Sequence, residues 1–465
     1  MILPPVFAQR MMKILDQEYS DFEQSLESEI ATSIRINPEK YKDIPALVPV
    51  EYCETGYFLP VRPLFTLDPF IHSGVYYVQE PSSMFLEQAI KQISLTSDTK
   101  ILDLCAAPGG KSTHLASLLP NGGLLVSNDV IRARSQILSE NLKKWGNPNV
   151  IVTNNDPHDF QRLTNFFDLI VIDAPCSGEG LFRRDPNAVL EWSPDNAQLC
   201  AQRQQRILAD VWPALKENGI LIYSTCTFNP AENEDNIKWL SKFAEIEPVS
   251  LNIEEQLGVT ITDALGFPCY RFYPHKVSGE GFFVSVIRKS GKSGSMQLRK
   301  VRENPLQASK AEIAKAKTLI NDENLEILRF EDSLLTFPCH LLNGLLQIKN
   351  NLRIVHAGVK IGEIKQMDLI PAHELALSSV LNRSVFPEIE LTIEEAIIYL
   401  KRDDISPISR NRGWNLITYR NIPTGWVKNL GNRYNSAFPK EWRIRMSVSE
   451  FHGQRLSDEI NKFPL

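Results

Sequence analysis

The sequence lacks the features that mark membrane and secreted proteins. No apolar run approaches the roughly 18 residues that a membrane span needs, and residues 1–24 lack the apolar core of a signal peptide. The segment instead predicts a helix entered through Pro4 and Pro5. Its apolar spacing buries four side chains: Phe7, Met11, Leu15 and Phe22. We therefore expect a cytoplasmic protein without a membrane partner.

Closely spaced cysteines are also missing. The chain holds seven, and the closest two, Cys176 and Cys200, lie 24 residues apart. No CxxC zinc pattern can form at such spacing, so we expect no metal site. An odd number of widely spread cysteines in a cytoplasmic protein indicates free thiols, most of them buried as small apolar side chains.

A surplus of positive charge is absent over the whole chain. The 465 residues carry 50 Lys and Arg against 56 Asp and Glu, for a net charge of −6. Two segments depart from this balance. Residues 288–305 hold six basic residues and one acidic residue, and residues 406–445 hold eight and one. The second segment interleaves its charges with six aromatic residues: Trp414, Tyr419, Trp426, Tyr434, Phe438 and Trp442. Backbone charge and stacking faces together are typical of a nucleic-acid surface.

The middle of the chain follows a regular pattern. Apolar runs bounded by turn residues alternate with longer helical segments, which predicts βαβ units and a mostly parallel, Rossmann-like sheet. We expect an antiparallel edge strand at 281–289, since it follows a GEG turn. The other predicted strands are 100–106, 123–129, 150–156, 167–175 and 219–226. A helix is expected near 393–401, and short strands around 339–364.

Acidic and glycine residues gather where the predicted strands end. Gly109 and Gly110 follow the first strand and allow the backbone to approach a ligand closely. Asp129, Asp156 and Asp173 each end a later strand. Singly, each could cap a helix. Three at one sheet edge, without a GxGxxG turn or a phosphate-binding lysine motif, favour S-adenosylmethionine over NAD.

Two cysteines are predicted at the same edge. Cys176 lies in DAPCSGEG and Cys226 in STCTFNPAENE, each after a strand. A thiolate can attack carbon 6 of a pyrimidine and make carbon 5 nucleophilic enough to take a methyl group; a base must then remove the carbon 5 proton. Both cysteines could instead be structural, but turn residues surround them. The residues alone do not say which thiol attacks.

Three motifs carry a resemblance to a known family. CAAPGGK, DAPCSGEG and STCTFNPAENE resemble those of the Nol/Nop/Sun family of RNA 5-methylcytosine methyltransferases. IRINP at 34–38 and YYVQEPSSM at 76–84 resemble segments that precede its catalytic domain. GWVKNLGNRYNSAFPKEWR at 425–443 resembles the PUA-like tail of its bacterial RsmF-type rRNA members.

The resemblance implies a role for each motif residue. Cys226 is the implied nucleophile, and Cys176 resolves the adduct. Asp129 holds the ribose and Asp156 the adenine region of S-adenosylmethionine, while Asp173 holds its amino-acid end or the cytosine ring. The remaining implied cofactor contacts are Cys105, Ala106, Ala107, Pro108, Gly109, Gly110, Lys111 and Arg134. Lys111 could also be a surface lysine, and we interpret His114 as a structural histidine.

Five arginines are candidates for RNA binding: Arg183, Arg184, Arg410, Arg412 and Arg433. The first two could equally be solvated, and half of the tail aromatics could form a small core. We expect a monomer that methylates 16S rRNA, free or in the small ribosomal subunit; a tRNA substrate and a non-catalytic assembly factor are the alternatives. A small-molecule methyltransferase would not need the basic linker and tail.

The expected fold is α/β with further domains on both sides. An N-terminal α+β segment for RNA recognition covers residues 1–92, and the catalytic domain 93–289. A basic linker at 290–310 leads to a small α/β, ferredoxin-like domain at 311–385 and a PUA-like β domain at 386–465.

Overall fold

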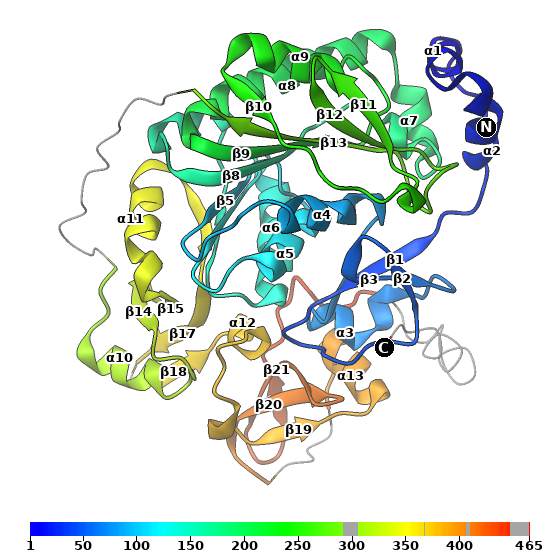
Figure 1. Ribbon diagram of the computed structural model, residues 1–465. Coiled ribbons are helices and arrows are strands. Elements are labelled where there is room, and N and C mark those ends of the chain that lie inside the picture. Colours follow the sequence, from blue (N-terminus) through cyan, green and yellow to red (C-terminus); the bar gives the residue numbers. More distant parts are fainter. Residues whose placement is uncertain (292–305, 367, 406–409, 447–464) are drawn as a thin grey trace.

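The computed structural model describes the whole chain except residues 292–305, 367, 406–409 and 447–464. Most of the predicted linker therefore lies outside the described residues. The described part contains four sheets, and the largest forms the centre of the molecule (Figure 1). No helix in this part is both long and apolar enough to cross a membrane.

The central sheet combines parallel and antiparallel strands. Its order is β11-β12-β13-β9-β8-β5-β6-β7-β16, and β10 pairs with β13 outside this path. The five strands from β9 to β7 are mutually parallel, as the βαβ pattern predicted. The bounds are β5 Lys100–Asp103, β6 Leu124–Asn128, β7 Val150–Thr153, β8 Phe167–Asp173, β9 Leu215–Thr225, β10 Ile246–Pro248, β11 Thr260–Ala264, β12 Phe267–Phe272, β13 Phe282–Lys289 and β16 Ile354–Ala357.

The strand predicted at 281–289 is antiparallel but does not lie at the edge. β13 pairs with β9 on one side and with β12 on the other. The edge prediction was wrong because the hairpin β11–β12, which the sequence analysis did not predict, covers β13. Both faces of the sheet are apolar, and Leu169, Ile170, Val171 and Ile172 of β8 are all buried. Such fully buried strands need helices on both faces.

Helices cover the central sheet on both faces (Figure 1). The longest, α8, starts with Ser193 as its N-cap, whose side chain accepts a hydrogen bond from the Asn196 amide, and with Pro194 at its first position. α8 spans Pro194–Val211. The other helices between residues 69 and 243 are α3 Pro69–His72, α4 Leu86–Lys91, α5 Gly110–Leu118, α6 Arg132–Trp145, α7 Pro186–Glu191 and α9 Glu234–Phe243. Short 3-10 helices lie at Asp16–Glu18, Phe65–Leu67, Ser82–Phe85, Pro157–Leu163, Glu179–Leu181, Trp212–Ala214, Glu255–Leu257, Cys339–Leu341 and Arg383–Val385.

The N-terminal segment starts with the predicted helix. α1 spans Pro5–Leu15, α2 spans Tyr19–Ser25, and all four predicted apolar side chains are buried. Phe7 and Phe22 pack against Phe228, which lies two residues after Cys226. A second sheet follows, in the order β2-β3-β1-β4. Its strands are β1 Thr32–Ile36, β2 Val48–Val50, β3 Cys53–Leu59 and β4 Tyr76–Val78.

The domain after the linker forms an antiparallel meander. Its strand order β14-β15-β17-β18 differs from the ferredoxin-like arrangement that we expected. Residues 342–351 form α11 instead of a strand, so the predicted strands start only at residue 354. Between α11 and β17, strand β16 leaves this sheet and pairs with β7 of the central sheet. The bounds are α10 Lys310–Lys317, β14 Leu325–Phe330, β15 Ser333–Pro338, α11 Leu342–Asn351, β17 Val359–Lys365 and β18 Asp368–Pro371.

The C-terminal sheet has the order β19-β20-β21-β22 and packs against α13, which matches the helix predicted near 393–401. Four of the six tail aromatics are buried, namely Tyr419, Trp426, Tyr434 and Phe438. They form the core of this small domain, which is the alternative that the sequence analysis gave for half of the tail aromatics. Trp414 and Trp442 are half-buried. The bounds are α12 His373–Leu377, β19 Glu388–Glu390, α13 Ile393–Lys401, β20 Gly413–Tyr419, β21 Ile422–Asn429 and β22 Tyr434–Ser436.

Candidate active site

A cavity of about 340 Å³ opens at the carboxyl ends of the parallel strands. Residues from the ends of β5, β8 and β9 line it, among them Cys105, Asp173 and Cys226. The opposite wall comes from residues 77–80, at the end of β4 and directly after it, and from residues 280–282, which lead into β13. The sequence analysis assigned no site role to these two segments. In open α/β sheets this edge is where ligands bind.

The glycine-rich turn after β5 forms one wall of the cavity. Gly109 has a φ of 120°, a backbone conformation that residues with a Cβ rarely adopt, and it leads directly into α5. The turn also contains a cis peptide bond between Ala107 and Pro108. Arg134 donates to the Ala107 carbonyl over 2.6 Å. The predicted cofactor residues in this cavity wall are Cys105, Ala106, Ala107, Pro108, Gly110 and Lys111; Gly109 and Arg134 lie outside the wall.

The two predicted thiols lie side by side. The Sγ atoms of Cys176 and Cys226 are 3.1 Å apart; Cys226 lines the cavity, whereas Cys176 does not. The hydrogen bond to Cys226, followed by burial, raises the pKa of Cys176 well above its usual value. The two thiols therefore share one hydrogen bond, in which either sulfur can be the donor.

A close backbone approach sets the position of Cys226. The Gly180 amide donates to the Cys226 carbonyl over 2.9 Å. A Cβ at residue 180 would lie only 2.7 Å from that carbonyl oxygen and 2.5 Å from the carbonyl oxygen of Gly281. Only glycine fits here, so the GEG turn at residues 178–180 brings the loop after β8 against the loop after β9.

Asp173 and Lys111 form an ion pair at the cavity wall. The Lys111 Nζ lies 2.8 Å from Asp173 Oδ2, and the Ser224 hydroxyl donates to Asp173 Oδ1 over 2.9 Å. Burial alone would lower the pKa of Lys111, but the carboxylate of Asp173 outweighs it and raises that pKa. Lys111 is thus no surface lysine: its charge is held at the cavity wall that Cys226 also lines.

The other two predicted acids lie at the same sheet edge but outside the cavity wall. The buried Asp129 accepts a hydrogen bond from the Ile131 amide and lies 3.6 Å from Arg134. Asp156 caps the 3-10 helix that starts at Pro157 and lies 3.4 Å from Arg206. The helix-capping alternative therefore holds for Asp156.

Asp103 is an acid that the sequence analysis missed. It ends β5 and lines the cavity, and its Oδ1 is buried with no hydrogen-bond partner among the described residues. Burial raises its pKa to about 7. Asp103 ends its strand just as Asp173 does, so the signal that singled out Asp173 could also have found Asp103.

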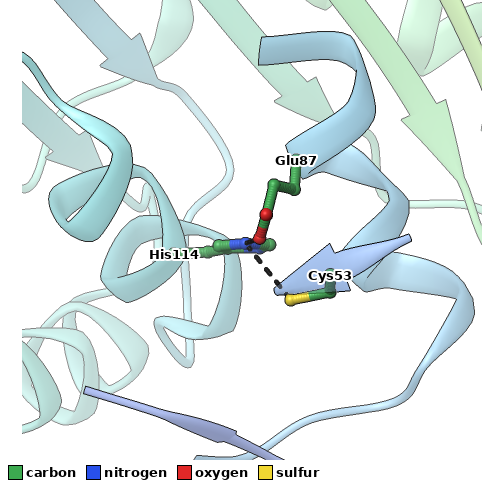
Figure 2. Close-up of side chains that lie close together, drawn as sticks. All are labelled: Cys53, Glu87 and His114. Atoms are coloured by element: carbon green, nitrogen blue, oxygen red, sulfur yellow. Dashed lines mark hydrogen bonds and ion pairs between the residues drawn. The ribbon is translucent and has the colours of Figure 1, made fainter. Parts of the chain in front are cut away.

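A second group of reactive side chains lies away from the cavity wall. Cys53, Glu87 and His114 converge in Figure 2, with 3.8 Å between Cys53 Sγ and His114 Nε2 and 3.0 Å from that nitrogen to Glu87 Oε2. The other Glu87 oxygen is ion-paired with Lys91. Burial and then the nearby charge of Arg35 lower the pKa of His114 to about 4. Because Lys91 already balances the charge of Glu87, we interpret the cluster as a packing contact that joins β3 to α5.

The candidate RNA-binding arginines have different surroundings. Arg183 is almost fully buried: it pairs with Glu280 over 3.3 Å and donates to the carbonyls of Ser25 and Gly279. It holds the N-terminal segment in place, and its role in RNA binding stays a prediction. Arg184 is exposed at the cavity. In the C-terminal domain the candidates are also exposed: Arg410, Arg412 and Arg433.

A doubly wound sheet with a glycine turn, acidic strand ends and paired thiols defines an α/β methyltransferase domain. Comparisons with known families agree. Residues 91–288 match 16S rRNA methyltransferase RsmB/F, residues 3–81 match the N-terminal domain of 16S rRNA methyltransferase RsmF, and residues 386–444 match the RsmF PUA domain.

Individual relatives extend this match to nearly the full chain. Ribosomal RNA small subunit methyltransferase F of Escherichia coli strain UMN026 is 30% identical over 94% of this chain and 96% of its own. The chain belongs to the ribosomal RNA small subunit methyltransferase F family. A methyltransferase homolog from Pyrococcus horikoshii is 28% identical, with a TM-score of 0.52 over 61% of this chain and 94% of its own. NSun6 from the same organism, solved with SFG, shares the fold at 20% identity and a TM-score of 0.52, over 62% of this chain and 99% of its own.

Proposed function

We propose that this protein is an S-adenosylmethionine-dependent rRNA methyltransferase that forms 5-methylcytosine in 16S rRNA. The observation that carries the proposal is the pair of thiols 3.1 Å apart beside the cavity. The similarity to 16S rRNA methyltransferases supports the rRNA substrate. It favours this substrate over tRNA, and an enzyme over a non-catalytic assembly factor.

The cavity residues fit S-adenosylmethionine. The unpartnered Oδ1 of Asp103 and the ion-paired Asp173 can accept hydrogen bonds from the amino group of its methionine part. Lys111, the only Lys or Arg besides Arg184 in the described cavity wall, is already paired with Asp173, which suits a cationic ligand better than a phosphate. When bound, S-adenosylmethionine supplies the methyl group as an electrophilic sulfonium. We assign Asp129 to the ribose and Asp156 to the adenine region.

In the proposed mechanism Cys226 attacks first. Its sulfur bonds to carbon 6 of the cytosine, and carbon 5 then takes the methyl group. Once Cys226 is bonded to carbon, its sulfur is a thioether that forms only a weak hydrogen bond, and the hydrogen bond to Cys226 is the largest cause of the raised pKa of Cys176. Cys176 then loses its proton to solvent more readily and acts as the base at carbon 5.

The cytosine has to leave its stack to reach these thiols. Flipping a base costs a few kcal/mol, and least when the RNA is already single-stranded. A second cavity of about 350 Å³ adjoins the first, and residues 78–80 and Arg184 line both. Exposed Arg62 also lines it. We assign this cavity to the RNA beside the flipped base.

We further propose a division of labour along the chain. Residues 1–92 and the PUA-like domain at 386–465 bind RNA, and residues 93–289 catalyse the reaction. The linker at 290–310 and the domain at 311–385 connect the catalytic and PUA-like domains. The exposed Arg410, Arg412 and Arg433 fit this role for the C-terminal domain. We expect the enzyme to act as a monomer in the cytoplasm.

Single cysteine variants test the order of events. Cys176→Ala retains the attacking thiol but lacks the base, so a covalent protein–RNA adduct should accumulate on a denaturing gel. Cys226→Ala should give neither adduct nor product. The buried Cys200→Ala is a matched control and should turn over normally. The reverse pattern for the first two variants would contradict the assignment.

The substrate can be read directly from RNA. Bisulfite sequencing of rRNA and tRNA from a deletion strain should show a lost 5-methylcytosine in 16S rRNA only. Loss in tRNA would favour the first alternative, and no loss in either would favour the non-catalytic factor.

A further inference from the structure

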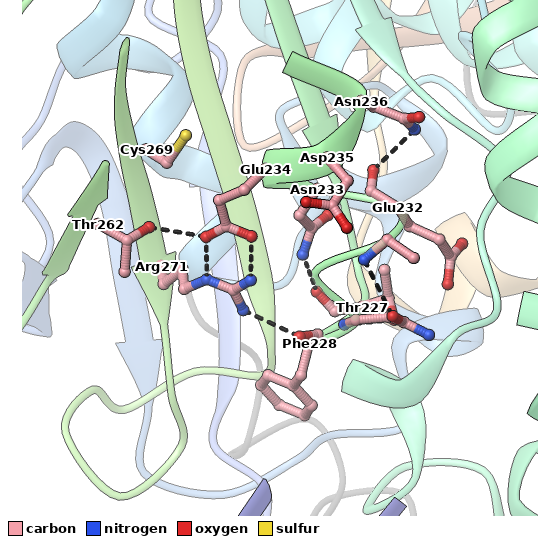
Figure 3. Close-up of polar contacts among 12 residues, drawn as sticks. Thr227, Phe228, Glu232, Asn233, Glu234, Asp235, Asn236, Thr262, Cys269 and Arg271 are labelled. Atoms are coloured by element: carbon pink, nitrogen blue, oxygen red, sulfur yellow. Dashed lines mark hydrogen bonds and ion pairs between the residues drawn. The ribbon is translucent and has the colours of Figure 1, made fainter. Parts of the chain in front are cut away.

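Three consecutive residues after the Cys226 loop are buried and polar. Glu232, Asn233 and Glu234 lie at the start of α9, and each reaches a different part of the site. In Figure 3 the side chains of Glu232 and Glu234 point to opposite sides of the chain. Buried polar groups usually keep all their hydrogen bonds, so each partner fixes a position.

Glu232 holds the loop of Cys176. Its carboxylate accepts the backbone N–H of Ser177 over 2.9 Å and, on its other oxygen, the Ser177 hydroxyl. Gln204 of α8 donates to Glu232 over 2.9 Å and to the Pro175 carbonyl over 3.0 Å. The residues on both sides of Cys176 are thus tied to one carboxylate and its amide neighbour.

Asn233 holds the loop of Cys226. Its Oδ1 accepts the Thr225 hydroxyl over 2.6 Å, and its Nδ2 donates to the Thr227 carbonyl over 2.9 Å. These partners are the residues directly before and after Cys226. The neighbouring side chain therefore fixes the second thiol in the same way as Glu232 fixes the first.

Glu234 has no contact with either cysteine loop. It pairs with Arg271 of β12 and accepts the Thr262 hydroxyl of β11 over 2.7 Å (Figure 3). Arg271 also donates to the Phe228 carbonyl over 3.0 Å. This third residue joins α9 to the hairpin β11–β12, so its role belongs to the fold.

We propose that Glu232 and Asn233 are positioning residues that serve the two halves of the reaction separately, Asn233 the attack by Cys226 and Glu232 the release by Cys176. The inference rests on the proposed function. In the release step the Cys176 thiolate takes the carbon 5 proton and becomes a thiol. The C–H electron pair forms the carbon 5–carbon 6 double bond, and the sulfur–carbon 6 bond breaks to return the Cys226 thiolate.

Single-atom exchanges separate the two roles. Glu232→Gln replaces a carboxylate oxygen by a donor where three donors converge, which releases the Cys176 loop. Asn233→Asp removes the donor to the Thr227 carbonyl. Each change should slow turnover by about 100-fold, the cost of misplacing a reacting group by about 1 Å. Glu232→Gln should in addition accumulate the covalent adduct, whereas Asn233→Asp should form little.

The matched control is Asp235→Asn, the same exchange on the same helix. Asp235 is exposed and pairs only with Lys238 among the described side chains, so turnover and adduct should stay at the wild-type level. Variants are incubated with transcribed 16S rRNA and S-adenosylmethionine and separated on a denaturing gel. Melting curves without RNA confirm folding. If Glu232→Gln does not fold, Ser177→Ala, which removes one of its donors, should show the same accumulation more weakly.

The outcomes separate this inference from the proposed function. If Cys176→Ala itself traps no adduct, the proposed function fails. If Cys176→Ala traps an adduct and a folded Glu232→Gln variant does not, Glu232 has only a structural role and the inference is overturned. Equal accumulation in Glu232→Gln and Asn233→Asp would also overturn it, because the two residues would then not act on separate steps.

Discussion

Asp103 shows how a single residue can link cofactor binding to pH. Its carboxyl group lines the cavity, and the Ser112 hydroxyl donates to one of its oxygens over 2.6 Å. Burial raises its pKa from 3.8 to about 7. In the folded protein this carboxyl group therefore titrates near neutral pH. Its ionised form is the one that suits a cationic ligand.

Stability should depend on this proton. Between pH 4 and 7 the folded state holds a proton on Asp103 that the unfolded state has released, so the free energy of unfolding falls as the pH rises. The slope from this group is at most about 1.4 kcal/mol per pH unit. Asp103→Asn should remove that contribution in urea denaturation at pH 5 and pH 8. Asp195→Asn, the same exchange at an exposed position, should not change the slope of the free energy of unfolding against pH. If Asp103→Asn also leaves this slope unchanged, another group causes the pH dependence.

Some site residues could be predicted from the sequence and others could not. Cys176, Cys226 and Asp173 were predictable because each follows a strand and carries reactive chemistry, and the structure brings them together. Arg183 and Arg184 were not separable, since adjacent arginines in a turn look alike until their partners are known. Glu280, the partner of Arg183, is almost a hundred residues further along the chain.

At the scale of elements, the N-terminal helices α1 and α2 hold the turn that positions the two cysteine loops. Arg10 of α1 lies 2.6 Å from Glu179 in the GEG turn, and Arg183 reaches back to the end of α2. Trp192 also donates to Glu179. The turn that places the loop of Cys176 against Cys226 therefore depends on contacts with the first 28 residues.

The two neighbouring arginines should behave differently on substitution. Arg183→Ala leaves Glu280 buried without its cation, which should lower the free energy of unfolding by about 3–5 kcal/mol. Arg184→Ala removes an exposed charge and should change stability by less than about 0.5 kcal/mol, while RNA binding weakens. Urea denaturation and RNA titration of both variants check this. Similar stability losses in the two would contradict the separation.

Local pattern explains which elements were predictable. β5 to β9 form long apolar runs between turns, and their burial on both faces leaves a clear signal. In the hairpin β11–β12 apolar and polar residues alternate less clearly. Residues 339–351 were apolar enough for either a strand or a helix. β16 could not be assigned to the central sheet, because its partner β7 lies about 200 residues earlier and nothing local encodes that pairing.

For the whole molecule, the position of charge matters more than its sum. The net charge is −6, yet Arg412 lies beside Gly431 in the turn that precedes Arg433. These two residues and Arg410 expose their charges on the C-terminal domain. An acidic chain can therefore present a local cationic surface to RNA.

Reversing these three charges should weaken RNA binding and its salt dependence. Each lost phosphate contact lowers the slope of log affinity against log salt by about 0.7 for single-stranded RNA, so the triple Arg→Glu variant should lose about 2. Titrations at several salt concentrations measure this. Lys242→Glu on α9, at the opposite end of the molecule in Figure 1, serves as the control. An unchanged slope in the triple variant would exclude this surface.

The pairing of β16 with β7 has a consequence for how the protein is made. Synthesis runs from the N-terminus, and domains generally fold as they emerge. The catalytic sheet has all its other strands by residue 289, but its β7 edge stays open until residues 354–357 have left the ribosome. An open edge is a template for pairing with other chains. The nascent enzyme thus passes through an interval of more than sixty residues in which its catalytic sheet still lacks its last strand.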